Sequence, residues 1–158
     1  MATILQTLET ECANLTTPCT FKLANLEEGN ATIFDKLTDS EFPLLLVLPF
    51  DINDVSRETG RVISEAEINA LFLTKVSNST MDDKAYDVEQ KANAPMRALA
   101  KEFVNRLDLN DIIEDNGIET VNHRTVQGEP VGDAHLYGCW SVFTIRFSED
   151  LSTCLPHE

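Results

Sequence analysis

The stretch that decides the fold reads FPLLLVLPF at residues 42–50, and INALFLTKV follows it at residues 68–76. The first run is apolar on both sides and bounded by prolines, which is typical of a strand covered on both faces. The second run alternates, with residues 68, 70, 72, 74 and 76 on one side and 71, 73 and 75 on the other. Two strands of one sheet are therefore predicted.

The segment between these strands, Asp51–Ser64, is polar and shows no clear period. One interpretation is a long exposed loop of a dozen residues, and loops of that length in compact domains are often functional. The other is a hairpin whose strands extend into the segment. The residues favour neither interpretation over the other.

Two helices are indicated. Thr3–Leu15 places apolar residues at helical spacing and ends before Pro18, because the residue before a proline avoids the helical region. Tyr86–Leu107 carries a longer apolar stripe. Pro95 interrupts it, so either the helix is kinked there or Asn93 caps a helix with Pro95 in its first turn.

Three further segments read as strands: Thr20–Leu26, Ile118–Gln127 and His135–Phe147. Consecutive strands with tight links favour antiparallel pairing. The expected fold is α+β, with a mainly antiparallel sheet of about five strands and two helices packed on one face. Residues 1–147 are expected to form a single domain, and residues 148–158 an exposed C-terminal extension.

The charge excludes one class of function. The chain has 158 residues and a formal net charge of −15, so its surface repels free nucleic acid. Solubility is the ordinary explanation of such acidity, and a wall past which DNA slides is the more specific one. No signal peptide and no apolar stretch long enough for a membrane span are seen, which favours folding in a cytoplasm. The four cysteines lack zinc-site spacing.

No catalytic motif stands out. His123 lies in a strand pattern, and Asp133 and His135 are two apart, so they could share a strand face. A metal site needs three or four ligands, and none of the usual zinc, nucleophile or nucleotide motifs is present. We therefore expect no enzyme, no cofactor, no metal and no catalytic residue.

The order of elements resembles that of the tail-terminator, or tail-completion, proteins of tailed bacteriophages, which have neighbours among head–tail joining proteins. The similarity rests on the N-terminal helix, the strand at residues 42–48, the alternating strand at 68–76, the helix beginning PMRALAKEF at 95–103, and the closing strand GCWSVFTI at 138–145. It covers most of residues 3–147 as a pattern, without a diagnostic motif.

The resemblance implies a non-enzymatic virion protein of the tail or neck region, assembled in the host cytoplasm. Such subunits form rings, commonly hexameric and in some connectors dodecameric, which contact tail-tube and head–neck proteins and let viral DNA pass without specific binding. No membrane is involved. The segment between the central strands would contact the neighbouring subunit or line the lumen. The candidate interface residues are Asp51, Asp54, Arg57, Glu58 and Arg61.

Two alternatives compete with this hypothesis. A small α+β enzyme or ligand-binding domain would use Asp133, His135 and His123, which predicts a pocket that holds all three. A generic adaptor subunit of a bacterial secretion-like or conjugative machine would share the same sequence features.

Overall fold

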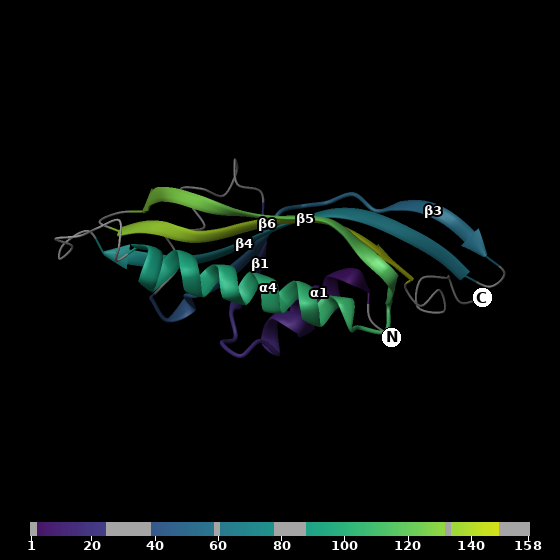
Figure 1. Cartoon of the computed structure of the whole chain (residues 1–158), viewed down its shortest axis with the longest axis horizontal. Coiled ribbons are helices and arrows are strands. Elements are labelled where there is room, and N and C mark those ends of the chain that lie inside the picture. The colour runs from purple at the N-terminus through teal and green to yellow at the C-terminus, as the bar shows by residue number, and fades with distance from the viewer. Residues whose placement is uncertain (1–2, 25–38, 59–60, 78–87, 132–133, 149–158) are drawn as a thin grey trace.

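The computed structural model describes residues 3–24, 39–58, 61–77, 88–131 and 134–148. A long curved sheet forms one layer, and the helices α1 and α4 lie on one of its faces (Figure 1). In chain order the elements are α1 (Ile4–Ala13), β1 (Thr20–Leu23), η1 (Asp39–Glu41), β2 (Leu44–Val47), β3 (Asn53–Glu58), β4 (Arg61–Ser77), η2 (Glu89–Asn93), α4 (Ala94–Asp108), β5 (Ile113–Val131) and β6 (Ala134–Phe147).

The sheet has six strands in the order β1-β2-β4-β6-β5, with β3 also paired to β4. The α+β class and the helices on one face are as expected, but the strand number and the pairing are not. β4 has 17 residues. Its first part pairs with β3 and its last part, residues 70–73, with β2. β3 was expected only under the hairpin interpretation, because its sequence, NDVSRE, has no apolar alternation.

The sheet is mixed and not purely antiparallel, because β1 and β2 run parallel, with Thr20 opposite Leu44 and Leu23 opposite Val47. The other pairs described are antiparallel. The expectation assumed tight links between successive strands. The chain from residue 24 to residue 43 is long enough for a crossover, which a parallel pair requires.

The main core fills the space between the helices and the sheet. β2 contributes Leu45 and Val47, and β4 contributes the face predicted for it, with Ile68, Ala70 and Phe72. The other buried members come from both helices, the start of β5 and β6: Ile4, Leu8, Cys12, Leu15, Met96, Leu99, Ala100, Phe103, Leu107, Ile112, Ile113, Cys139, Phe143, Ile145 and Phe147. The apolar residues that recur at helical and strand spacing in the sequence therefore pack together in this core.

A smaller apolar cluster lies on the opposite face of the sheet. Its buried members are Leu44, Leu46, Leu71, Leu73, Val126 and Leu136. Trp140 packs against it half-buried, and its indole N–H donates to the Asn69 side-chain oxygen at 3.0 Å. All four residues of β2 are buried, so the prediction of a strand covered on both faces is confirmed.

The helix ends follow from local chemistry. Thr3 caps α1 through a capping box with Gln6, in which each side chain accepts from the other residue's backbone N–H. Before Pro95 the chain forms a π-helical turn, with the Ala94 N–H bonded to the Glu89 carbonyl. Asn93 makes no capping hydrogen bond, so the predicted cap is wrong, but Pro95 does lie in the first turn of α4 as that interpretation required. The wider turn makes room for the proline ring, which would otherwise press on the carbonyl four residues earlier.

The expected C-terminal extension, residues 148–158, lies outside the described residues except for Ser148. Its backbone N–H donates to the Ile112 carbonyl at 2.9 Å, and its hydroxyl donates to Glu114. The segment therefore begins fastened to the start of β5.

Replacing Phe103 by alanine is expected to lower the free energy of unfolding by about 3–5 kcal/mol, the usual range for a buried phenylalanine. Phe103 is fully buried, and its ring meets that of Phe72 edge-on at 5.5 Å between centroids. Urea unfolding measures the change. The control is Asn105→Ala on the exposed side of α4, which should alter stability by less than about 0.5 kcal/mol. A loss under about 1 kcal/mol for Phe103→Ala would contradict the packing described.

Candidate assembly surface

The segment expected as a loop is a β-hairpin. Asn53 pairs with Glu65, Asp54 with Ser64, and Glu58 with Arg61. The loop interpretation of Asp51–Ser64 is therefore wrong, and the hairpin interpretation is confirmed. The ladder satisfies the backbone groups of a polar segment without needing an apolar period. The hairpin lies at one end of the sheet (Figure 1).

The five candidate interface residues all fall on or beside this hairpin. Asp51 is exposed just before β3, and Asp54 lies within β3, where its carboxylate accepts from the Ser64 hydroxyl at 3.1 Å. Arg57 and Glu58 end β3 and Arg61 begins β4, so the backbone brings these three together at the tip. The structure thus gathers the candidates on one projecting element.

Sequence reasoning missed two apolar residues of the hairpin. Ile52 is 46% exposed and Val55 is 48% exposed. Val55 sits at a bulge, where the register shifts between Asp54 and Ser56. An isolated apolar residue in a polar stretch gives no sign of its exposure, so the only available signal was that each of the two residues follows an aspartate and precedes a polar residue. Half-exposed aliphatic side chains beside an outer strand edge are suited to contact with another surface.

Acidic side chains gather on the sheet face away from the helices. Glu65 and Glu67 of β4 point there, and Glu119 of β5 lies in the same rows. One cation faces these three carboxylates: the Arg146 Nε donates to Glu65 at 2.9 Å. That hydrogen bond, together with the charge of Glu119, raises the pKa of Arg146. This acidic face, the patch defined by Glu65, Glu67 and Glu119, is net negative, whereas Lys75 and Arg124 lie farther along the same side of the sheet.

The histidines of the competing enzyme hypothesis are not brought together. His123 of β5 lies opposite Ser141 of β6, whereas His135 pairs with Pro130 near the start of β6. Six positions of an extended strand separate Ser141 from His135, which is about 20 Å. Asp133 lies outside the described residues, as does His157, the third histidine. No shared pocket with His123 and His135 follows from this spacing.

His123 and Ser141 form a short pair of their own. The His123 Nδ1 and the Ser141 hydroxyl are 2.6 Å apart, and the Cys139 sulfur lies 3.6 Å from the same hydroxyl. Burial lowers the pKa of His123, with a smaller contribution from Lys101. Ser141 is completely buried. A nucleophile must reach its substrate, so the pair is best explained as a satisfied polar contact under α4.

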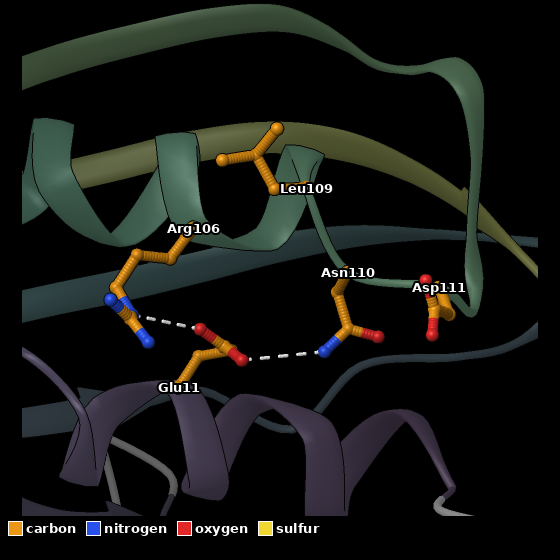
Figure 2. A pocket seen from close by; sticks show the side chains of 5 residues that line it. All are labelled: Glu11, Arg106, Leu109, Asn110 and Asp111. Atoms are coloured by element: carbon orange, nitrogen blue, oxygen red, sulfur yellow. Dashed lines mark hydrogen bonds and ion pairs between the residues drawn. The ribbon is translucent and has the colours of Figure 1, made fainter.

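A surface pocket of about 320 Å³ lies where α1 meets the end of α4, lined by Glu11, Arg106, Leu109, Asn110 and Asp111. Figure 2 shows the Glu11 carboxylate between two donors. The Arg106 Nε donates to one oxygen at 2.9 Å, and the Asn110 amide donates to the other at 3.3 Å. Because both oxygens are engaged, the cluster ties the two helices together.

A second tie joins the same two helices. The Thr16 backbone N–H, just past α1, donates to the Glu102 carboxylate of α4 at 2.8 Å. This hydrogen bond is the main reason that the pKa of Glu102 is lowered. The helix layer is therefore held as a unit beneath the sheet, which keeps the hairpin and the acidic face on a rigid support.

The ion pair between Glu11 and Arg106 is expected to contribute about 1 kcal/mol to stability. The Glu11 side chain is only 11% exposed, but that of Arg106 is 39% exposed, so solvent screens part of the attraction. A double-mutant cycle of Glu11→Gln and Arg106→Gln measures this coupling by urea unfolding. The more exposed pair of Glu89 and Arg97 serves as the control and should show weaker coupling. Equal coupling in the two pairs would contradict this prediction.

The described residues hold no group of three or more His, Cys, Asp or Glu side chains placed to bind a metal ion. Over the same residues, no helix is both long enough and apolar enough to cross a membrane. No protein-family model matches the chain, and no curated protein matches it in sequence. The function therefore has to be argued from the surface described above.

Proposed function

We propose that the protein is a structural subunit of a tailed bacteriophage that closes into a ring, ends the tail or joins it to the head, and lets DNA pass. The observation that carries the proposal is the projecting β3–β4 hairpin. It stands where the resemblance expects the contact with a ring neighbour, and it presents Ile52 and Val55 half-exposed. Partners would be further copies of the chain, tail-tube proteins and head–neck proteins.

The outer strands β5 and β3 differ in how readily they could pair with a strand of a neighbouring subunit. β5 forms one edge, but three register shifts break it, and Asn116 and Thr120 adopt left-handed conformations within it. Bulges of this kind blunt an edge against further pairing. β3 has one register shift and, among the described strands, pairs only with β4. A neighbouring subunit would therefore meet the β3 edge more readily than the β5 edge.

Contact through the hairpin is directional. The hairpin of one copy would meet a different surface on the next, which makes the interface heterologous, and such interfaces close into rings when the rotation allows. Burial of an aliphatic side chain contributes about 1.5–3 kcal/mol when complete, and roughly half of that remains available at Ile52 and Val55. Repeated at each contact, this gain favours a closed ring over an open chain.

The acidic face supports the second half of the proposal. Glu65, Glu67 and Glu119 outnumber Arg146 on it, and the whole chain carries a net charge of −15. Repeated around a ring, a surface of this sign lining the hole would repel phosphates and let DNA move without being held. A basic lining would bind the same DNA and slow it.

Negative-stain imaging of the purified chain tests this function, together with a DNA mobility-shift assay at low salt. We expect rings with a central hole and no retained DNA. A preparation without rings, or one that binds DNA tightly at low salt, would contradict the proposal. A catalytic turnover that disappears on His135→Ala would favour the enzyme hypothesis instead.

A further inference from the structure

We propose that Cys12 and Cys19 are a redox-active dithiol, which a small-molecule disulfide oxidises to an intramolecular disulfide in the folded chain. This inference is independent of the proposed function. Cys12 lies in the last turn of α1, and Cys19 directly precedes β1. The Cys12 sulfur donates to the Cys19 backbone carbonyl at 3.3 Å. The Cys12 sulfur is thus held against the backbone of Cys19, across the turn that separates the two residues.

The Cys19 side chain is the largest influence on the Cys12 thiol and lowers its pKa, even though burial acts in the opposite direction. The same pairing, together with burial, raises the pKa of the Cys19 thiol. The Cys19 sulfur has a further contact at 3.6 Å, with the Thr17 carbonyl. A pair of neighbouring cysteines in which one thiol has a lowered pKa favours thiol–disulfide exchange.

Exposure assigns different roles to the two sulfurs. Cys12 is completely buried, whereas Cys19 is partly exposed at the edge of the main core. An oxidant can therefore reach Cys19 first. Cys139 is the third cysteine that the described residues include; it is 2% exposed and contacts Ser141, and burial raises its pKa. It provides a matched internal control.

The reaction balances as two exchanges. The Cys19 thiol passes its proton to the Cys12 thiolate, and the Cys19 sulfur attacks one sulfur of the oxidant disulfide, whose S–S bond breaks and releases one thiolate. The Cys12 thiol then loses its proton to solvent and attacks the Cys19 sulfur, forming the Cys12–Cys19 bond and releasing the second thiolate. The protein loses two electrons and two protons, and the oxidant gains them as two thiols.

The bond would close the chain from residue 12 to residue 19 and fasten the end of α1 to the start of β1. The loop inside this ring is already held at Thr16, whose N–H is bonded to Glu102 of α4. Oxidation would thus add a covalent link between the end of α1 and the start of β1, where the Cys12 sulfur already contacts the Cys19 carbonyl. We expect the melting temperature to rise by roughly 5 °C, as a short closed loop in a chain of this size implies.

The test is incubation of the native full-length chain with oxidised glutathione, followed by alkylation, tryptic digestion and mass measurement. Both cysteines fall in one tryptic peptide, residues 1–22, because Lys22 is the first basic residue. We expect this peptide to lose two hydrogen masses and to escape alkylation, and dithiothreitol to reverse both changes and the rise in melting temperature. If both cysteines are still alkylated, or if Cys19 keeps a glutathione adduct, the proposal is wrong.

Three controls keep the result interpretable. Cys12→Ser should leave a stable glutathione adduct on Cys19, because the resolving thiol is gone, while Cys139→Ser should form the disulfide as the wild type does. The same oxidation in urea should run about tenfold more slowly, since the native fold holds the thiols together. An equal rate in urea, or loss of the disulfide in Cys139→Ser, would overturn the proposal.

Discussion

Gly138→Ala is expected to prevent the chain from folding. Gly138 lies in β6 with φ at +153°, a backbone conformation that other residues adopt at a cost of about 1–3 kcal/mol. A Cβ atom there would lie 1.8 Å from the Phe72 carbonyl oxygen of β4. The obstacle is the backbone of a neighbouring strand in the middle of the sheet, so no side-chain movement can relieve it. Forced separation of β4 from β6 adds a further cost of at least about 1–3 kcal/mol.

Soluble yield and circular dichroism melting of Gly138→Ala measure this effect. The control is Thr144→Ala in the same strand, which pairs with Glu67 on the sheet face away from the helices and should change the free energy of unfolding by less than about 1 kcal/mol. A cooperative melt for Gly138→Ala within a few degrees of the wild type would contradict the close approach of the two strands.

The double variant Ile52→Asp with Val55→Asp is expected to leave the fold intact and to abolish the ring. Both side chains are about half exposed in the single chain, so their replacement should cost the fold little. Buried against a neighbour, each aspartate would lose its hydration without a partner, which costs several kcal/mol per contact. Because a closed ring repeats the contact at every subunit, the penalty multiplies around it.

Size-exclusion chromatography with light scattering measures the assembly of this variant, and circular dichroism measures its fold. Val121→Asp is the matched control, since Val121 of β5 is exposed to a similar degree, 43%, but lies on the blunted edge. We expect Val121→Asp to assemble as the wild type does. If the double variant still forms rings, or if Val121→Asp dissociates them equally, the hairpin is not the contact.

The parts of the fold that sequence reasoning predicted are those with a strong apolar period. The strand predicted within residues 42–50 is present but shorter, as β2 at Leu44–Val47, and residues 68–76 lie in β4 with the predicted face in the core, because burial fixes which residues may be apolar. The stripe of α4 around Phe103 and the face of β6 around Phe143 were found in the same way. The apolar residues that repeat at each of these spacings lie in the main core.

Features that depend on pairing were not visible in the sequence. β3 is held by its ladder to β4 and needs no apolar side chain, so the sequence could not decide between a loop and a hairpin at residues 53–58. The parallel pairing of β1 with β2 is decided by the path of the chain between them, which side-chain chemistry does not encode. The π-helical turn before Pro95 likewise depends on how the preceding turn adapts to the ring.

The sequence predicted where the candidate surface lies, but not which apolar and acidic side chains it exposes. The sequence pointed to residues 51–64 because they were polar and unneeded by the core, and the structure places Asp51, Asp54, Arg57, Glu58 and Arg61 on or beside one hairpin. It did not point to Ile52 or Val55, because exposure is a property of the folded chain. The acidic face of Glu65, Glu67 and Glu119 required the register of β4, β6 and β5.

The central claim, that this chain assembles into a closed ring, is tested most directly by its mass in solution across a range of concentrations. Light scattering is predicted to give one species at a fixed multiple of the 17.6 kDa chain, such as six copies, unchanged on dilution as expected for a closed ring. A mass of 17.6 kDa at every concentration, or a mass that keeps growing with concentration as an open chain would, contradicts the claim.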